Sequence, residues 1–550
     1  MIDSSGHSSQ PAASDAVPLA AKFIVLIVII AAAAALLFSA PTNGDFWWFD
    51  ASSHAMNGAF IHDLVAAAPL RNPMDWAVNY YLQYPAISIG LYPPLFPVSE
   101  ALVFSVLGVS HFAAQVTVAI FTGFLALAIY NLARLRLSWV AATGAVLMFL
   151  GLPGIAFWGR QVMLEVPAMC FAAWSMFLLV RYIERGRAPW LYASAFALVL
   201  ALYTKQTFAF LAPAAAVALL WTCGWRVILR REIWIAIFAS AVLLLPLAAM
   251  TLKFGMMNAS LAAGVNASAP GRFSLPSLLW YAADLPTAAG WPVVFLAAVF
   301  LIFWGGAQLR HRDPLISAMA ASFLVGYVFF TMIALKDGRY TLHFLVPLVI
   351  AACFAIHRAL PQRWSTPLTV ALGAGLFVFT LATQSVPRVA GFREAAILVA
   401  DQTPPDTTVL FYGQRSGAFV FNLRALGSRR DIRVLRAEKL FVHYRQGRTA
   451  GVTDLGADAA EIKAIFPRYR IAYAVYDPRF WDDLPSIQTM NQVLSGSDFT
   501  ALKTITIQAN VAHNDRELRV ARFDGKLQAR AEPLRMDMPL INGRFSEKGK

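Results

Sequence analysis

Charged side chains are scarce in this 550-residue chain. Asp, Glu, Lys and Arg make up 14% of it and hydrophobic residues 58%, with a mean hydropathy of +0.58, whereas an ordinary soluble domain carries about 25% charge. Cysteine is also scarce: Cys170, Cys223 and Cys353 lie far apart in or beside apolar segments. Their spacing fits no metal motif and argues against a disulfide framework. Internal repeats are absent, which leaves an inverted-repeat transporter little support.

Apolar runs of about 20 residues, the length that a bilayer demands, recur along the chain. Pro18 to Ala40 is too long for the core of a signal peptide, so we interpret it as an uncleaved first span after a polar, disordered tail at 1–17. The candidate spans are 18–40, 111–133, 139–157, 164–182, 190–204, 207–222, 233–252, 288–307, 315–335, 340–357 and 366–386. The sequence therefore predicts a polytopic α-helical membrane protein.

Arginine residues in the short loops between spans predict the orientation. The net charge of +14 lies largely in these loops, so it is not a nucleic-acid signal. The arginines are Arg134 and Arg136, then Arg181, Arg185 and Arg187, then Arg226, Arg230 and Arg231, then Arg310 and Arg312, and finally Arg358 and Arg363. All five loops fall on the cytoplasmic side if segment 95–108 does not cross. Because that segment is short, follows Pro93-Pro94 and contains Glu100, we predict a re-entrant or interfacial helix.

From Arg388 onward the composition becomes charged and polar, and this map places the tail outside the cytoplasm. Short β-rich runs lie at Thr407–Tyr412, Ala418–Leu423, Ile432–Leu435, Ile471–Tyr476, Leu502–Ile507 and Leu518–Phe523, and helical patterns lie at Phe392–Gln402 and Asp458–Phe466. This alternation predicts a small α/β domain. The tail has no Gly-rich phosphate loop and no nucleophile motif, so we interpret it as a lid or an acceptor-docking module.

Charged residues gather on the predicted outer face. They are Asp45 and Asp50 after the first span, Arg160 and Glu165 around the start of the span at 164, Lys205 in a break between apolar segments, Arg272 in a later loop, and Lys336, Asp337, Arg339 and Tyr340 at the mouth of the span at 340. Charges at membrane depth are costly and indicate function. Carboxylates and cations around one cavity suit a substrate with an anionic phosphate and a hydroxyl to be deprotonated.

Each of these residues also has a structural interpretation. Asp50 either N-caps the helix that begins there or acts as a base, and a cap position would weaken a base by favouring the ionised form. His54, one turn on, and His62 suit interfacial polar residues better than metal ligands. Structural roles for the remaining residues are a Glu165–Arg160 ion pair, snorkelling of Lys205 and Arg339 at span ends, and an interfacial anchor formed by Trp47-Trp48.

Five ordered motifs resemble those of the C-type glycosyltransferase superfamily. They are an Asp-x-x-x-x-Ala helix (Asp50 to Ala55), Pro93-Pro94-Leu95, an Arg-x-x-x-x-acid element (Arg160 and Glu165), Thr204-Lys205, and Arg339-Tyr340. The chain is most similar to the dolichyl-phosphate-mannose protein mannosyltransferase-like family, which includes the lipid A aminoarabinose transferases. It departs from the latter at Leu91-Tyr92, where they have an acid-Lys pair. Glu165 stands where Asp is common, and His343 stands where related chains often have proline nearby.

The resemblance implies a fold of about 11–13 spans over 18–386, a first periplasmic loop at 41–110 and a periplasmic α/β domain at 388–550. It implies inverting transfer of a sugar from a polyprenyl-phosphate donor to a hydroxyl of a glycan, glycolipid or protein, in a bacterial inner membrane and without a metal or other cofactor.

The resemblance also implies residue roles. Asp50 would be the general base, and Glu165 would orient the acceptor or Arg160. The expected substrate-binding residues are His54, Tyr92, Arg160, Lys205, Arg272, Arg339 and Tyr340, with the cations stabilising the leaving phosphate. The alternative function is a transporter or flippase of a lipid-linked or anionic substrate. A transporter needs access from both sides, whereas these charges lie on one.

Overall fold

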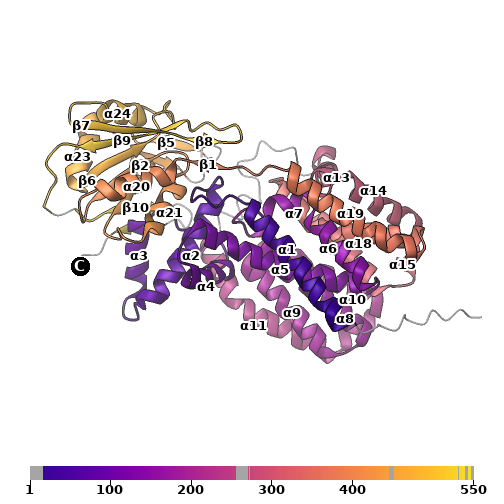
Figure 1. Ribbon diagram of the computed structural model, residues 1–550. Coiled ribbons are helices and arrows are strands. Elements are labelled where there is room, and N and C mark those ends of the chain that lie inside the picture. Colours follow the sequence, from indigo (N-terminus) through magenta and orange to yellow (C-terminus); the bar gives the residue numbers. More distant parts are fainter. Residues whose placement is uncertain are drawn as a thin grey trace, which may run out of the picture.

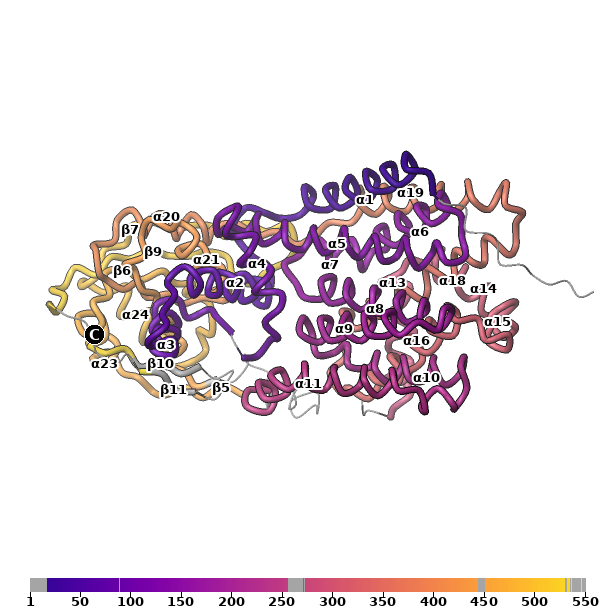
Figure 2. Tube along the Cα trace, turned by 90° about the horizontal axis from the view of Figure 1, so that it is seen from below, coloured from indigo at the N-terminus to yellow at the C-terminus, as the bar shows by residue number. Residues whose placement is uncertain are grey.

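The computed structural model describes residues 17–88, 90–255, 271, 273–444, 451–529, 532–538 and 543–546. A long helical bundle makes up most of the molecule, and a smaller α/β region lies at one end of it (Figure 1). Helices of the first loop lie beside the α/β region at that end of the bundle (Figure 2). A polytopic helical protein with a C-terminal α/β region is therefore confirmed.

Nine helical segments in the described residues are long and apolar enough to cross a membrane. They are α1 (Leu19–Ser39), α5 (His111–Arg134), α8 (Glu165–Arg185), η1 (Gln206–Phe210) with α10 (Leu211–Cys223), α11 (Arg231–Phe254), α14 (Trp291–Phe300) with η3 (Leu301–Gly305) and α15 (Gly306–Arg310), α16 (Pro314–Met332), α17 (Gly338–Thr341) with η4 (Leu342–Phe344) and α18 (Leu345–Ala359), and α19 (Gln362–Thr383). Two further helical segments of the bundle are η2 (Trp225–Leu229) and α13 (Leu275–Ala289).

Two predicted spans form apolar helices that are too short to count among these nine segments. The segment predicted at 139–157 is divided into α6 (Trp139–Leu150) and α7 (Pro153–Trp158), because Pro153 begins a new helix at a position where its missing N–H is not needed. The 12 residues of α6 rise about 18 Å, well short of the hydrocarbon core. The segment predicted at 190–204 is α9 (Ala188–Thr204), with 17 residues. Glycines bring α6 close to α19: a Cβ on Gly373 would lie 2.2 Å from the carbonyl oxygen of Gly144.

The first loop contains three helices, α2 (Phe49–Ala67), α3 (Pro73–Gln83) and α4 (Leu95–Leu107). The 13 residues of α4 rise about 20 Å, which is less than the thickness of the hydrocarbon core. This length agrees with the predicted re-entrant or interfacial helix. Helix α4 packs closely on α2, since a Cβ on Gly58 would lie 2.6 Å from the Cβ of Glu100. This close packing holds α2 and α4 against each other.

A five-stranded mixed sheet forms the centre of the α/β region, in the order β3 (Arg433–Arg436), β2 (Thr408–Tyr412), β6 (Ile471–Tyr476), β9 (Glu517–Phe523) and β7 (Phe499–Thr506). Strand β2 is parallel to β3 and β6, whereas β9 is antiparallel to β6 and β7. The helices are α20 (Phe392–Gln402), α21 (Ser416–Leu426), α22 (Glu438–Phe441), α23 (Ala459–Arg468) and α24 (Pro485–Leu494). Strand pairs are β1 (Val389–Ala390) with β8 (Gln508–Ala509), β4 (Val442–Tyr444) with β5 (Val452–Asp454), and β10 (Arg535–Met538) with β11 (Gly543–Ser546).

The predicted strand at Ala418–Leu423 is wrong, because this segment lies inside helix α21. Its residues Phe419, Val420 and Phe421 are all buried, so the run lacks the alternation that identifies a half-buried strand. Short apolar runs of this kind do not distinguish a buried strand from a buried helix. The other five predicted strands are confirmed within three residues at either end.

Asp45 joins the first loop to the α/β region. Its carboxylate accepts hydrogen bonds from the backbone N–H groups of Gly391, Phe392 and Arg393 at 2.8–3.1 Å, at the start of α20, and from Asn422 Nδ2 at 2.7 Å. A helix N-terminus favours an anion at this place. Burial raises the pKa of Asp45 to about 6, against these hydrogen bonds, which lower it. The role of Asp45 in the structure is therefore attachment of the loop.

Candidate functional site

Asp50 lies in the first turn of α2, at the end that faces the bundle. The N-cap residue is Trp48, which makes no side-chain cap, so the capping interpretation of Asp50 is wrong. The Asp50 carboxylate instead accepts hydrogen bonds from the Tyr92 hydroxyl at 3.1 Å and from Arg339 Nη1 at 3.0 Å. Burial acts to raise the pKa of Asp50, but nearby His54 and Arg339 and the two hydrogen bonds hold it below its usual range. With 38% of its side chain exposed, Asp50 is an accessible carboxylate.

Arg339 connects three carboxylates. Its Nε and Nη2 atoms donate to Asp337 Oδ2 at 2.9 and 2.7 Å, its Nη1 atom donates to Asp50, and its Nε atom lies 3.8 Å from Glu165 Oε1. Asp337 also accepts from the Arg339 backbone N–H and so caps the short helix α17. The rigid fork of a guanidinium suits such an arrangement and suits phosphate equally well.

Glu165 and Lys205 form a buried ion pair beside Arg339. Lys205 Nζ lies 2.5 Å from Glu165 Oε1, and the Glu165 side chain is 2% exposed. Lys205 is in extended conformation between α9 and η1, and Glu165 begins α8. The predicted Glu165–Arg160 pair is therefore wrong. Glu165 Oε2 is buried without a hydrogen-bond partner among the described residues, so this cluster retains an unused acceptor.

Aromatic and imidazole groups lie on one side of Asp50 and beside Lys205. The His54 ring packs edge-on against Tyr92 at 4.6 Å and Phe96 at 6.2 Å. Burial raises the pKa of Tyr92 well above its usual range, so its hydroxyl stays protonated and donates to Asp50. Tyr340 stacks on Phe330 at 4.9 Å, and its ring lies 5.8 Å from Lys205 Nζ.

The structure therefore brings together seven of the nine predicted site residues, which are Asp50, His54, Tyr92, Glu165, Lys205, Arg339 and Tyr340. Arg160 has another position: its Nε donates to Ala156 O at 2.7 Å and its Nη2 to Gln384 O at 3.0 Å, which holds α7 to the segment after α19. Arg272 lies outside the described residues.

Two residues of the cluster had no expected catalytic or binding role, although Asp337 is among the charged residues of the predicted outer face. Asp337 is the carboxylate closest to Arg339, and an Asp-Gly pair before a helix is the sequence signal that could have identified it as a cap. Trp158 lies 5.9 Å from the Arg339 guanidinium and 5.6 Å from Trp48, but nothing in the sequence places it there. Within the part of the chain that the structure describes, no three His, Cys, Asp or Glu residues are grouped to hold a metal ion.

Comparison with known proteins identifies the fold. The family model for dolichyl-phosphate-mannose-protein mannosyltransferase matches residues 92–250. The structure of ArnT from Cupriavidus metallidurans bound to undecaprenyl phosphate matches with a TM-score of 0.60 and 13% identity, over 92% of this chain and 97% of that one. Its apo structure matches with a TM-score of 0.60 and 14% identity, over 92% and 99%. A search of the curated proteins finds no match.

Fold and site together define a polytopic membrane protein with an acid–cation cluster where its first loop meets the helical bundle. Its fold is that of the C-type glycosyltransferases, and the expected resemblance to this superfamily is confirmed.

Lys205→Met should destabilise the protein strongly. The change leaves Glu165 buried with only Arg339, 3.8 Å away, as a cation beside it, and breaking a buried ion pair in this way costs roughly 3–5 kcal/mol. We expect a lower melting temperature of the purified protein, with much of the loss recovered in the double variant Glu165→Gln/Lys205→Met. A single variant as stable as the wild type would contradict the buried pair.

His54 should make the protein sensitive to acid. Burial lowers the pKa of His54 to about 4 from 6.5, against Asp50 and Glu165, which raise it. Between pH 6.5 and pH 4 the unfolded chain therefore binds more protons than the folded one. As the pH falls through this range, the free energy of unfolding should decrease by about 3 kcal/mol. Melting temperatures across this range should fall less in His54→Phe than in the wild type. An equal decrease of the melting temperature with pH in both proteins would show that His54 is not buried in its neutral form.

Proposed function

We propose that this protein is an integral-membrane glycosyltransferase that moves a sugar from a polyprenyl-phosphate-linked donor to an acceptor hydroxyl. One observation carries the proposal: Asp50, an accessible carboxylate, shares Arg339 with Glu165, which is paired with Lys205. A base and two cations are the groups that hydroxyl activation and phosphate departure require. The fold shared with ArnT, which was solved with undecaprenyl phosphate, supports a polyprenyl-phosphate donor.

The reaction that fits this arrangement is a single displacement. Asp50 takes the proton of the acceptor hydroxyl, and the hydroxyl oxygen forms a bond to the anomeric carbon of the donor sugar. The bond from that carbon to the phosphate oxygen breaks, and its electron pair leaves with the polyprenyl phosphate. Because attack and departure occur on opposite sides, the anomeric configuration is inverted. No general acid is needed, since phosphate leaves as an anion that Lys205 and Arg339 stabilise.

The ion pair between Asp50 and Arg339 has a consequence for the order of events. An Asp held ionised by a guanidinium is a weak base. A donor phosphate competes for the same guanidinium, because Arg339 can turn its fork from carboxylate to phosphate. When Arg339 turns to the phosphate, the pKa of Asp50 rises. The Asp50 carboxylate then accepts hydrogen bonds only from Tyr92 and from the acceptor hydroxyl. Donor binding would thus activate the base.

We further propose that residues 18–386 form the catalytic membrane domain, that 1–17 is cytoplasmic, and that the loop at 41–110 and the α/β domain at 388–550 are periplasmic in a bacterial inner membrane. Arginine-rich loops at the far ends of the spans support this orientation. The acceptor would be lipid A or another lipopolysaccharide sugar, a cell-wall glycan or a secreted protein.

Turnover in detergent distinguishes an enzyme from a flippase, because a micelle has no two compartments. Purified protein in detergent receives a polyprenyl-phosphate sugar labelled in the sugar, together with crude envelope acceptors. We expect label in the acceptor and one polyprenyl phosphate released for each sugar transferred. Unchanged donor in detergent, together with movement of the same donor across proteoliposomes, would contradict the proposal and favour the flippase.

A further inference from the structure

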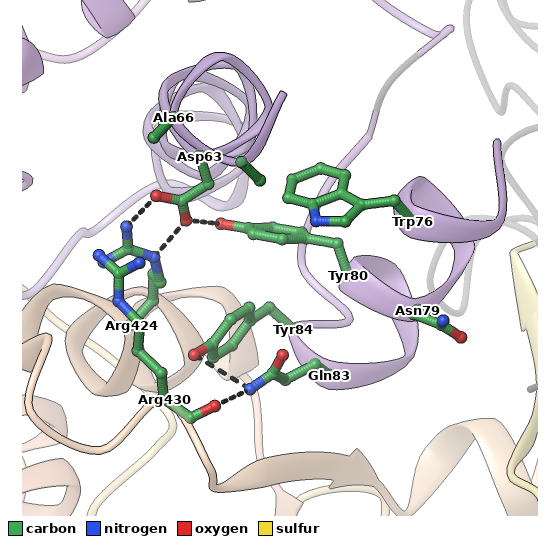
Figure 3. A pocket seen from close by; sticks show the side chains of 10 residues that line it. Asp63, Ala66, Trp76, Asn79, Tyr80, Gln83, Tyr84, Arg424 and Arg430 are labelled. Carbon is green, nitrogen blue, oxygen red and sulfur yellow. Dashed lines mark hydrogen bonds and ion pairs between the residues drawn. The ribbon is translucent and has the colours of Figure 1, made fainter. Parts of the chain in front are cut away.

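A pocket lies between the first loop and the α/β region (Figure 3), and none of the residues that line it belongs to the Asp50 cluster. Its volume is about 330 Å³, within the size range of small-molecule sites. Helix α2 contributes Asp63, α3 contributes an aromatic and amide face, and the α/β region contributes Arg424 and Arg430. Asp63 follows Asp50 by 13 residues on α2, a rise of about 20 Å.

One face of α3 lines this pocket with aromatic rings. Trp76 and Tyr80 are one turn apart, with centroids 5.2 Å apart and an interplanar angle of 30°, and Tyr84 follows at 5.2 Å from Tyr80. Trp76 is half-buried, so part of its ring remains accessible from the pocket. Aromatic rings that combine an apolar body with polar tips offer a surface on which the C–H face of a sugar ring can pack.

Amide and hydroxyl groups alternate with these rings. Asn79 and Gln83 occupy the adjacent positions on the same face of α3, and both line the pocket. The Asn79 side chain makes no hydrogen bond with any described residue, and Figure 3 shows it apart from the dashed contacts. Gln83 donates to Tyr84 at 3.3 Å, and burial raises the pKa of Tyr84 to about 12, so that hydroxyl keeps a proton to donate. Vicinal hydroxyls of a sugar match such paired donors and acceptors.

The pocket carries one positive charge in excess. Asp63 accepts two hydrogen bonds from Arg424, from Nε at 2.6 Å and from Nη2, so these two charges balance. The exposed Arg430 side chain extends toward Arg424 (Figure 3), and its guanidinium has no ion-pair partner among the described residues. A guanidinium in this position suits a carboxylate or a phosphate on the ligand.

We propose that this pocket binds a sugar residue with an anionic substituent, and that this residue belongs to the acceptor glycan. The second half of the proposal rests on the proposed function. The ring would pack on Trp76, the hydroxyls would bond with Asn79 and Tyr84, and Arg430 would hold the carboxylate or phosphate. An acceptor anchored about 20 Å from Asp50 along α2 would be held while its distal hydroxyl enters the catalytic site.

Isothermal titration of the full-length protein in detergent tests the binding directly. The probes are glucuronate, glucose 6-phosphate, neutral glucose and inorganic phosphate, each titrated into the wild type and into Asn79→Ala, Arg430→Ala and Arg71→Ala. Arg430 is exposed and Asn79 makes no hydrogen bond with a described residue, so neither change should unfold the protein. Arg71→Ala is the matched control, because it removes the same charge from the exposed loop before α3 without touching the pocket.

The expected result is saturable binding of at least one of the two anionic sugars, weakened at least fivefold in Asn79→Ala and in Arg430→Ala and unchanged in Arg71→Ala. Glucose should bind more weakly than the charged sugars. Inorganic phosphate that binds as tightly as the sugars would contradict a sugar site. Equal binding in all variants, or no binding in the wild type, would contradict the proposed sugar site. The pocket residues would then only pack the loop against the α/β region.

Kinetics separate this proposal from the proposed function. In the transfer assay, Arg430→Ala should raise KM for the acceptor and leave kcat unchanged. Asp50→Asn should lose transfer but keep the same sugar affinity. If neither Asn79→Ala nor Arg430→Ala changes the kinetics of transfer, the pocket is not an acceptor site, but the proposed glycosyltransferase function still holds. If the protein binds an anionic sugar but shows no transfer activity, the proposed glycosyltransferase function is wrong and the proposed sugar site still holds.

Discussion

Asp50→Asn should reduce kcat for sugar transfer by roughly 10²–10⁴-fold, which is the contribution of a general base. Asparagine has the shape of aspartate and can still accept a hydrogen bond from Tyr92, but it cannot take the proton of the acceptor. The donor-binding cations keep their places, and Arg339 loses one competing carboxylate. Donor affinity should therefore be unchanged or tighter.

Initial rates at saturating donor and acceptor, with donor affinity measured separately, provide the test for Asp50→Asn. Asp482→Asn is the control, because Asp482 is an exposed carboxylate of the α/β region. Rates within threefold of the wild type in Asp50→Asn would remove Asp50 from the reaction. A folded variant with lost donor binding would instead assign Asp50 to the donor site.

Arg339→Gln should have the second largest effect, a decrease of roughly 10²–10³-fold in kcat. The variant loses the guanidinium fork that would stabilise the leaving phosphate, and it places Asp50, Asp337 and Glu165 together with only Lys205 to balance them. KM for the donor should also rise. Arg339→Lys keeps the charge but not the fork, so its kcat should fall between those of the wild type and Arg339→Gln.

Steady-state kinetics with donor varied measures this effect, with the melting temperature as a check on folding. The double variant Arg339→Gln/Asp337→Asn removes one unbalanced carboxylate, so it should regain stability without regaining kcat. Arg363→Gln, at the exposed start of α19, is the charge-matched control. Recovery of kcat together with stability would show that Arg339 only holds the acidic residues in place.

Much of the helical part could be predicted because bilayer-length apolar runs give a strong signal. The limit of that signal is visible at α6, where Pro153 starts a new helix inside a continuous apolar run. It is also visible at α21, where three consecutive buried residues suggest a strand. At α6 the break is set locally by Pro153, whereas at α21 the outcome depends on packing between segments far apart in the chain, which periodicity does not record.

The site was predictable to the extent that charge is rare in a membrane protein. Rarity of charge singled out Glu165, Lys205 and Arg339, which lie far apart in sequence and meet in space, and the family resemblance supplied their expected roles. Pairing was not predictable: Arg160 is only five residues before Glu165, but the intervening turn directs its guanidinium to Gln384. Asp45 and Asp50 look alike in sequence, yet one attaches the α/β region and the other faces Arg339.

The configuration of the transferred sugar tests the central claim most directly, that an acceptor hydroxyl deprotonated by Asp50 displaces polyprenyl phosphate in one step. The product of a complete reaction in detergent is analysed by NMR, and the released polyprenyl phosphate is counted. Our account predicts one polyprenyl phosphate per sugar and an anomeric configuration opposite to that of the donor. A retained configuration, or a donor that remains intact, would contradict it.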